Sequence, residues 1–141
     1  MRFLPVPRAR RCHERGGLAV EFAFTLPLLL ALIFGTVDVG RLVMSQSMLS
    51  YAVAVGARTG AATNAATFTT VQTAVQNSAT LLNISSGSIH YQVNGGAADT
   101  GFGSRTPGST FTVYTTYSYQ PVFIKQLRSR TLNASSTVTI Q

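Results

Sequence analysis

Residues 18–37 read LAVEFAFTLPLLLALIFGTV, an apolar run that contains one charged residue, Glu21. An α-helix rises 1.5 Å per residue, so a run of this length spans about 30 Å, the thickness of the hydrocarbon core of a bilayer. Pro27 lies inside the run, and membrane helices accept an internal proline more readily than helices in water do. The sequence therefore predicts a transmembrane helix over residues 17–37.

The charges on either side of this run indicate its orientation. Residues 1–16 form a leader with five arginines and one glutamate, whereas the whole chain has a formal net charge of +7. Because Lys and Arg resist translocation, the leader is expected to remain in the cytoplasm. Asp38 and Arg41 mark the outer boundary, and their i, i+3 spacing allows the two side chains to face each other.

A nucleic-acid-binding patch is the competing interpretation of the basic residues. The later cluster around Lys125 lacks the interleaved aromatic side chains on which single-strand binders stack bases. We therefore interpret the leader as a topology signal and expect no nucleic-acid partner.

The composition leaves room for one small domain and little material for catalysis. The 141 residues include one Cys, two His and four acids, and 11% are charged, against roughly 25% in ordinary soluble domains. One Cys excludes an intramolecular disulfide and any multi-cysteine metal site. No GxSxG, HExxH or phosphate-binding glycine motif occurs in the sequence. We expect no enzyme activity, no cofactor and no metal.

Glu21 requires an explanation, because an acid at the centre of a bilayer costs about 2.5–3.5 kcal/mol on insertion scales. One interpretation places Glu21 among the cytoplasmic headgroups, where it needs no partner. The other begins with the Gly16-Gly17 pair. Cleavage after Gly16 would turn Gly17 into a new ammonium terminus, one helical turn from Glu21, and residues at i, i+4 can pair. The amine of a neighbouring subunit could serve equally well.

The helical pattern continues beyond the apolar run. One apolar face has the helical period, and it is widened by Leu42, Leu49 and Val53; its members are Val37, Met44, Met48, Tyr51 and Val55. We expect one helix from about Gly17 to Arg58, with its first half in lipid and its second half packed on a folded head through this face. Residues 60–67 form a break or a thin continuation.

The remainder of the chain predicts a small head, in which residues 38–82 are helical and residues 83–141 are β-rich. A second short helix is expected from Phe68, Val71, Val75, Ala79 and Leu82, which have helical spacing. Three segments then alternate with period two, namely residues 89–93, 111–119 and 132–140, and Asn94-Gly95-Gly96 provides a turn. Short connections favour antiparallel pairing, so the expected fold class is α+β, with about three strands packed on the long helix. His90 is expected to be a surface residue, and Asp99 to form a local loop turn.

Residues 16–22 contain a Gly followed by four residues, then Glu21 and the aromatic Phe22, which resembles the processing site of type IV prepilins. Further short motifs follow in order, namely Ala19-Val20-Glu21-Phe22-Ala23, Pro27-Leu28-Leu29-Leu30, Phe34-Gly35, Gly40-Arg41, Ala52 and Gly56-Ala57-Arg58. With this ordered set, the segment from Gly16 to Arg58 resembles the TadE-like family. Two features depart from the pattern: Asp38 stands where the family often carries Glu, and the double glycine leaves the cleavage site open between Gly16 and Gly17.

The resemblance implies a pilin-like fold and a role as a minor pseudopilin of tight-adherence (Flp, type IVb) pili. The implied location is the bacterial inner membrane, with the head outside. The implied partners are a prepilin peptidase, the major Flp pilin, other minor pseudopilins, the inner-membrane secretion platform and membrane lipid. The implied cleavage site is Gly16-Gly17 and the implied assembly residues are Glu21 and Phe22; the family-motif positions are Pro27, Gly35, Asp38, Gly40, Arg41 and Arg58.

Three alternatives remain from the residues alone. A secreted binding domain with a cleaved signal peptide would have a shorter apolar run and an A-x-A site after it. An exported or anchored enzyme is disfavoured by the few ionisable groups. A permanently anchored protein differs from the pseudopilin only in that the leader is never cleaved after Gly16.

Overall fold

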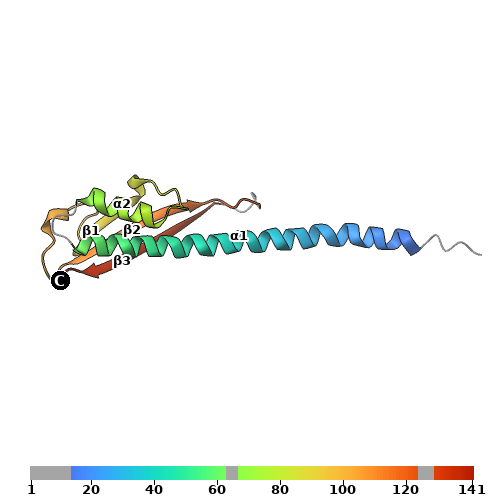
Figure 1. Cartoon of the computed structure of the whole chain (residues 1–141), viewed down its shortest axis with the longest axis horizontal. Helices are drawn as coiled ribbons and strands as arrows, with labels where there is room; N and C mark the ends of the chain where they lie inside the picture. The colour runs from blue at the N-terminus through green and yellow to red at the C-terminus, as the bar shows by residue number, and fades with distance from the viewer. Residues whose placement is uncertain (1–13, 63–66, 124–128) are drawn as a thin grey trace, which may run out of the picture.

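The long N-terminal helix is the axis of the fold. The computed structural model describes residues 14–62, 67–123 and 129–141, with only the backbone described for 14–16. Helix α1 runs over Glu14–Ala62, and its second half carries a head built from α2 (Phe68–Ser78) and a three-stranded sheet. Figure 1 shows α2 and the sheet packed beside this second half, while the first half extends away from them. The predicted α+β class is confirmed.

The sheet has the order β1-β2-β3 and is antiparallel throughout. Its strands are β1 (Ile89–Val93), β2 (Thr110–Tyr119) and β3 (Arg130–Thr139), so all three predicted strands are confirmed to within two residues. On β2 the alternate residues Phe111, Val113 and Thr115 are buried. The period of two in the sequence therefore did separate the inner face from the outer face. Asn94 and Gly95 of the predicted turn have positive φ values of 49° and 69°.

The face that α1 presents to the head agrees in part with the predicted one, because Leu49 and Val53 are fully buried as expected. Met44 and Tyr51 are 60% and 63% exposed, whereas Ala52 and Ala57 are fully buried. The reason is close approach. An added Cβ at Gly56 would overlap Val75 of α2, and one at Gly60 would overlap the ring of Phe111 in β2. Small residues at these positions allow the helix to lie close against α2 and β2, and Met44 and Tyr51 project away from the head.

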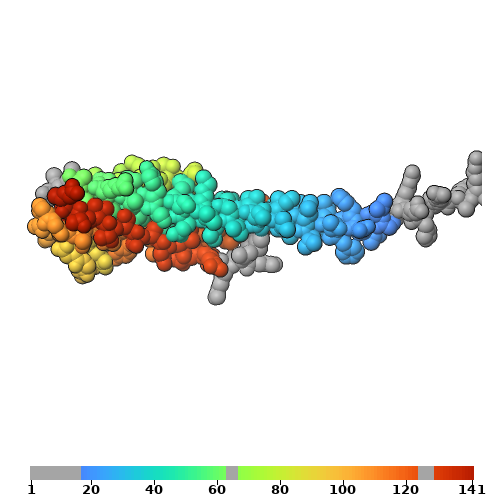
Figure 2. Space-filling model, turned by 90° about the horizontal axis from the view of Figure 1, so that it is seen from below, coloured from blue at the N-terminus to red at the C-terminus, as the bar shows by residue number. Residues whose placement is uncertain are grey.

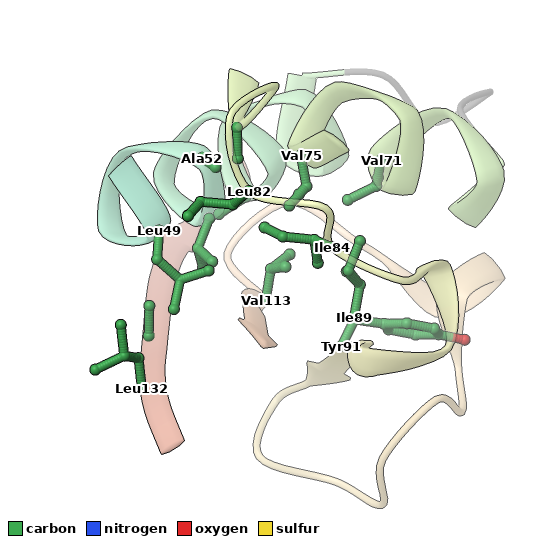
Figure 3. Packing of buried hydrophobic residues seen from close by; sticks show 14 of the residues in the cluster. Leu49, Ala52, Val71, Val75, Leu82, Ile84, Ile89, Tyr91, Val113 and Leu132 are labelled. Atoms are coloured by element: carbon green, nitrogen blue, oxygen red, sulfur yellow. The ribbon is translucent and has the colours of Figure 1, made fainter. Parts of the chain in front are cut away.

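Both helices end at positions other than those predicted. α1 continues past Arg58 to Ala62, and residues 63–66 of the predicted break lie outside the described residues. α2 ends at Ser78, although Ala79 and Leu82 beyond it are still buried in the core. Figure 3 shows this core, in which Leu49 and Ala52 of α1, Val71 and Val75 of α2, and Val113 of β2 converge.

Arg105 completes the outer end of α1, and the sequence analysis did not single it out. Its side chain is buried, its Nη1 donates to the Gly60 carbonyl, and its Nε donates to the Phe102 carbonyl at 2.6 Å. The guanidinium also lies 3.9 Å from the centroid of the Phe102 ring. Burial lowers the pKa of Arg105, and the nearby Tyr91 opposes that change. A cation at a helix C-terminus satisfies a carbonyl that has no partner within the helix.

Candidate membrane and assembly interface

Residues 17–37 of α1, called its bare half below, are exposed except for the half-buried Gly35. An 18-residue window within Gly17–Ala62 has a mean hydropathy of 2.2, none of it is buried, and this helix is long and apolar enough to cross a membrane. Figure 2 shows this segment extending beyond the head as an uncovered rod. Its large apolar side chains are mostly exposed: Leu18 is 71% exposed, Phe24 79%, Leu28 71% and Leu32 66%. An apolar helix with no protein cover must be covered by lipid or by other helices.

The predicted processing and assembly residues lie at the start of this bare helix. The helix already includes Gly16 and Gly17, because it begins at Glu14. Glu21 and Phe22 follow on exposed positions, and Phe22 is 66% exposed. Among the described residues, no hydrogen bond or ion pair is formed by the Glu21 carboxylate; only its carbonyl accepts a bond, from Thr25 Oγ1 at 2.9 Å. The carboxylate is therefore accessible to a group from outside the chain.

The remaining family-motif positions separate into different environments. Pro27 lies within α1, which is continuous through it. Arg41 and Arg58 are exposed on the outer half of the helix. Gly35 and Gly40 line an apolar hollow beside α1, described below.

Asp38 joins the helix to the end of the sheet. It is 6% exposed, its Oδ1 accepts a hydrogen bond from the Val122 N–H at 3.3 Å, and its Oδ2 accepts one from the Phe123 N–H at 3.1 Å. The Tyr119 hydroxyl donates to the Asp38 carbonyl at 3.0 Å. The i, i+3 spacing allowed Asp38 to face Arg41, but the carboxylate turns toward the backbone that follows β2, where two N–H donors point at it.

A hollow of about 580 Å³ lies between α1 and the end of β2. Its lining is almost entirely apolar and comprises Leu32, Gly35, Thr36, Asp38, Val39, Gly40, Leu42, Tyr119 and Pro121. Beside it, the Phe123 ring stacks on the Phe34 ring, with centroids 5.0 Å apart and planes 9° apart. The sequence analysis did not single out Pro121 or the two residues after it. The apolar Val122-Phe123 pair that follows Pro121 was the sequence feature that could have indicated a contact with α1.

Replacing Asp38 by Ala is expected to release the segment 121–123 from α1. Hydrogen bonds to a charged group contribute about 1.5–3 kcal/mol each, so amide exchange at Val122 and Phe123 should accelerate about tenfold or more. Hydrogen–deuterium exchange of the detergent-solubilised chain, followed by mass spectrometry, measures this. Asp99→Ala is the matched control, because the Asp99 Oδ1 accepts from the Tyr91 N–H at 3.1 Å. Unchanged exchange at residues 122–123 in Asp38→Ala would contradict the assignment.

His90 has a partner that sequence spacing did not reveal. Its Nδ1 lies 2.6 Å from Asp99 Oδ2, and both side chains are about two-fifths exposed, at 37% and 42%. The predicted loop turn at Asp99 is present, with φ of 56°, and it brings the carboxylate back to β1. The pair fastens the loop to the strand. In the described part of the chain, no three His, Cys, Asp or Glu side chains cluster as metal ligands do.

The fold and this interface define a protein with an apolar helical stalk and a small α+β head. Residues 16–58 match the family described as TadE-like protein, as the sequence resemblance predicted. The match covers less than a third of the 141 residues and lies on α1, including the bare half, Asp38 and the outer half as far as Arg58. No curated protein and no solved structure matches the chain. The similarity indicates involvement in the tight-adherence pilus system.

Proposed function

We propose that this chain is a minor pseudopilin needed for assembly of tight-adherence (Flp, type IVb) pili. In this proposal it enters the inner membrane with its leader in the cytoplasm and its head outside. A prepilin peptidase then cuts after Gly16. The mature helix packs with the major Flp pilin and other minor pseudopilins at the secretion platform.

The observation that carries the proposal is one continuous helix whose first half is bare and apolar while its second half is part of the head core. Because this helix is continuous, the position of its first half in a membrane or helix bundle also fixes the position of the head. The exposed Glu21 near its start supports the proposal. An acid on an apolar helix in a membrane is stabilised by a cation, and the N-terminal amine that cleavage creates would supply one. The TadE-like match over residues 16–58 includes both features.

The first test is the N-terminus and intact mass of the membrane-extracted chain, expressed with and without its prepilin peptidase. We expect a start at Gly17 that depends on the peptidase. Gly16→Leu should block cleavage, because a small residue is required before the scissile bond, whereas Gly17→Ala should still be cut and provides the matched control.

Two other outcomes would contradict the proposal. A start beyond residue 35 would indicate a signal peptide and hence a secreted binding or adhesion domain. An intact leader in both strains would indicate an anchored protein without pilin-type processing. A start at Leu18 would move the cleavage to the second glycine and place Glu21 fourth in the mature chain.

A further inference from the structure

The end of the β2–β3 hairpin reaches back along α1 into the apolar run. Figure 1 shows this end of the sheet pointing along α1 toward the N-terminal half of the helix. Phe123 stacks on Phe34, and the backbone N–H groups of Val122 and Phe123 bond to Asp38. Phe34 precedes Val37, the end of the apolar run, by three residues, or about 4.5 Å along the helix.

The length of α1 below the contact between Phe34 and Phe123 can be compared with the thickness of the hydrocarbon core. If the head remained wholly outside, the bilayer would enclose only residues 18–33, which span about 24 Å. The hydrocarbon core is about 30 Å thick, so the bilayer would have to thin or the basic leader would have to be drawn in. If the segment 121–123 enters the outer leaflet, residues 18–37 span the core without either distortion.

The segment 121–123 has the chemistry that this depth demands. Val122 and Phe123 are apolar and 48% and 50% exposed. Non-helical backbone at membrane depth is tolerated only where its polar groups find partners within the protein. Pro121 has no backbone N–H group, and the N–H groups of Val122 and Phe123 donate to Asp38. No backbone N–H group of these three residues therefore lacks a partner. The carboxylate in turn is buried with donors rather than exposed to lipid.

The hollow beside this segment continues the same apolar surface. Leu32, Val39 and Leu42 line it on α1, and Tyr119 and Pro121 close its other side. Its volume of about 580 Å³ falls in the range of roughly 300–1,000 Å³ typical of ligand pockets. Its lining on α1 begins at Leu32, within the apolar run, so this part of the hollow lies at the level where outer-leaflet acyl chains would surround the helix.

We propose that a lipid of the outer leaflet covers this surface: residues 121–123 insert at the boundary of headgroups and acyl chains, and one acyl chain fills the hollow. This inference rests on the membrane-spanning role of α1 in the proposed function. Amphipathic helices at the interface insert about 5–10 Å into that boundary, and the level of Phe34 lies within this depth, about 4.5 Å inside the end of the apolar run. The head is thereby held at a defined depth and rotation about the helix axis.

The test uses the full chain with Cys12→Ser, reconstituted in phosphatidylcholine vesicles. Single cysteines at Val122→Cys, Leu28→Cys and Leu81→Cys carry a fluorophore, and nitroxide phosphatidylcholines quench it at shallow or deep positions. Val122 is half-exposed and contributes its backbone N–H to the contact with Asp38, so the substitution leaves that bond available. Leu81 is an apolar residue of the head with 74% exposure and provides the matched control.

We expect the shallow nitroxide to remove most of the fluorescence at Val122, the deep one to do so at Leu28, and neither to affect Leu81. Quenching at Leu28 without quenching at Val122 would overturn the inference and leave the membrane helix standing. Absence of quenching at both would overturn the membrane-spanning role as well. Quenching at Val122 that disappears as the protein-to-lipid ratio rises would assign the surface to a second copy of this chain, and would overturn the lipid assignment.

Discussion

Glu21→Ala is expected to leave membrane insertion intact and to reduce the amount of assembled pili by at least about tenfold, equivalent to 1.4 kcal/mol. The carboxylate is exposed on an apolar helix. In the proposed function, its partner in an assembled bundle is the N-terminal amine that cleavage creates. Two unit charges 4 Å apart attract by about 4 kcal/mol at an effective dielectric of 20, and desolvation offsets part of this gain. Pili sheared from cells whose only copy carries the variant provide the measurement.

Two further variants separate charge from shape at this position. Glu21→Gln keeps the size and removes the charge, so it should fail as Glu21→Ala does. Glu21→Asp keeps the charge on a shorter side chain and should retain part of the assembly. Equal amounts of each variant in the membrane fraction show that insertion is unaffected. Wild-type piliation by Glu21→Gln would eliminate the charge-pairing role.

Phe111→Ala is expected to lower the free energy of unfolding of the head by about 3–5 kcal/mol, a large share of the 5–15 kcal/mol typical of a domain. The Phe111 ring is fully buried and lies 5.7 Å from the Phe102 ring and 5.9 Å from the Tyr91 ring, centroid to centroid. Gly60 of α1 lies directly against it. Truncation would leave a cavity at the junction of the long helix and the sheet.

Urea denaturation of the detergent-solubilised chain, followed by the circular dichroism of the sheet, measures this effect. The midpoint should fall by more than about 1 M, given slopes of 1–3 kcal/mol per molar urea. Tyr51→Ala is the matched control, since this aromatic residue of α1 is 63% exposed and its removal should change stability by less than about 0.5 kcal/mol. A midpoint for Phe111→Ala equal to that of the control would show that the contact between α1 and the sheet is not the centre of the core.

The sequence predicted the elements of this fold well because each carries its own period. The alternation in residues 111–119 identified β2, and the apolar run of residues 18–37 identified the bare half of α1. Val71 and Val75 identified the inner face of α2. Periodicity was less informative on the outer half of α1, where apolar side chains lie on more than one face. Met44 and Tyr51 have helical spacing but point away from the head.

The candidate site contains residues that the sequence could place and contacts that it could not. Gly16, Gly17, Glu21 and Phe22 form a local motif, so the sequence alone could place them together at the start of one helix, and they lie there. The partner of Asp38 could not be found from its neighbours, because the two N–H groups that it binds come from residues more than eighty positions later. The same holds for Arg105, whose acceptor at Gly60 lies 45 positions earlier.

The sequence by itself determined the basic N-terminal segment, the apolar helix of bilayer length and the small β-rich head, because charge, hydropathy and side-chain alternation are local properties. Only the tertiary structure decided which face of α1 enters the core and where the hairpin ends against it. Those outcomes depend on how closely backbones can approach, at Gly56 and Gly60, and on which backbone N–H groups reach Asp38. Such contacts join residues far apart in the chain, and no local pattern encodes them.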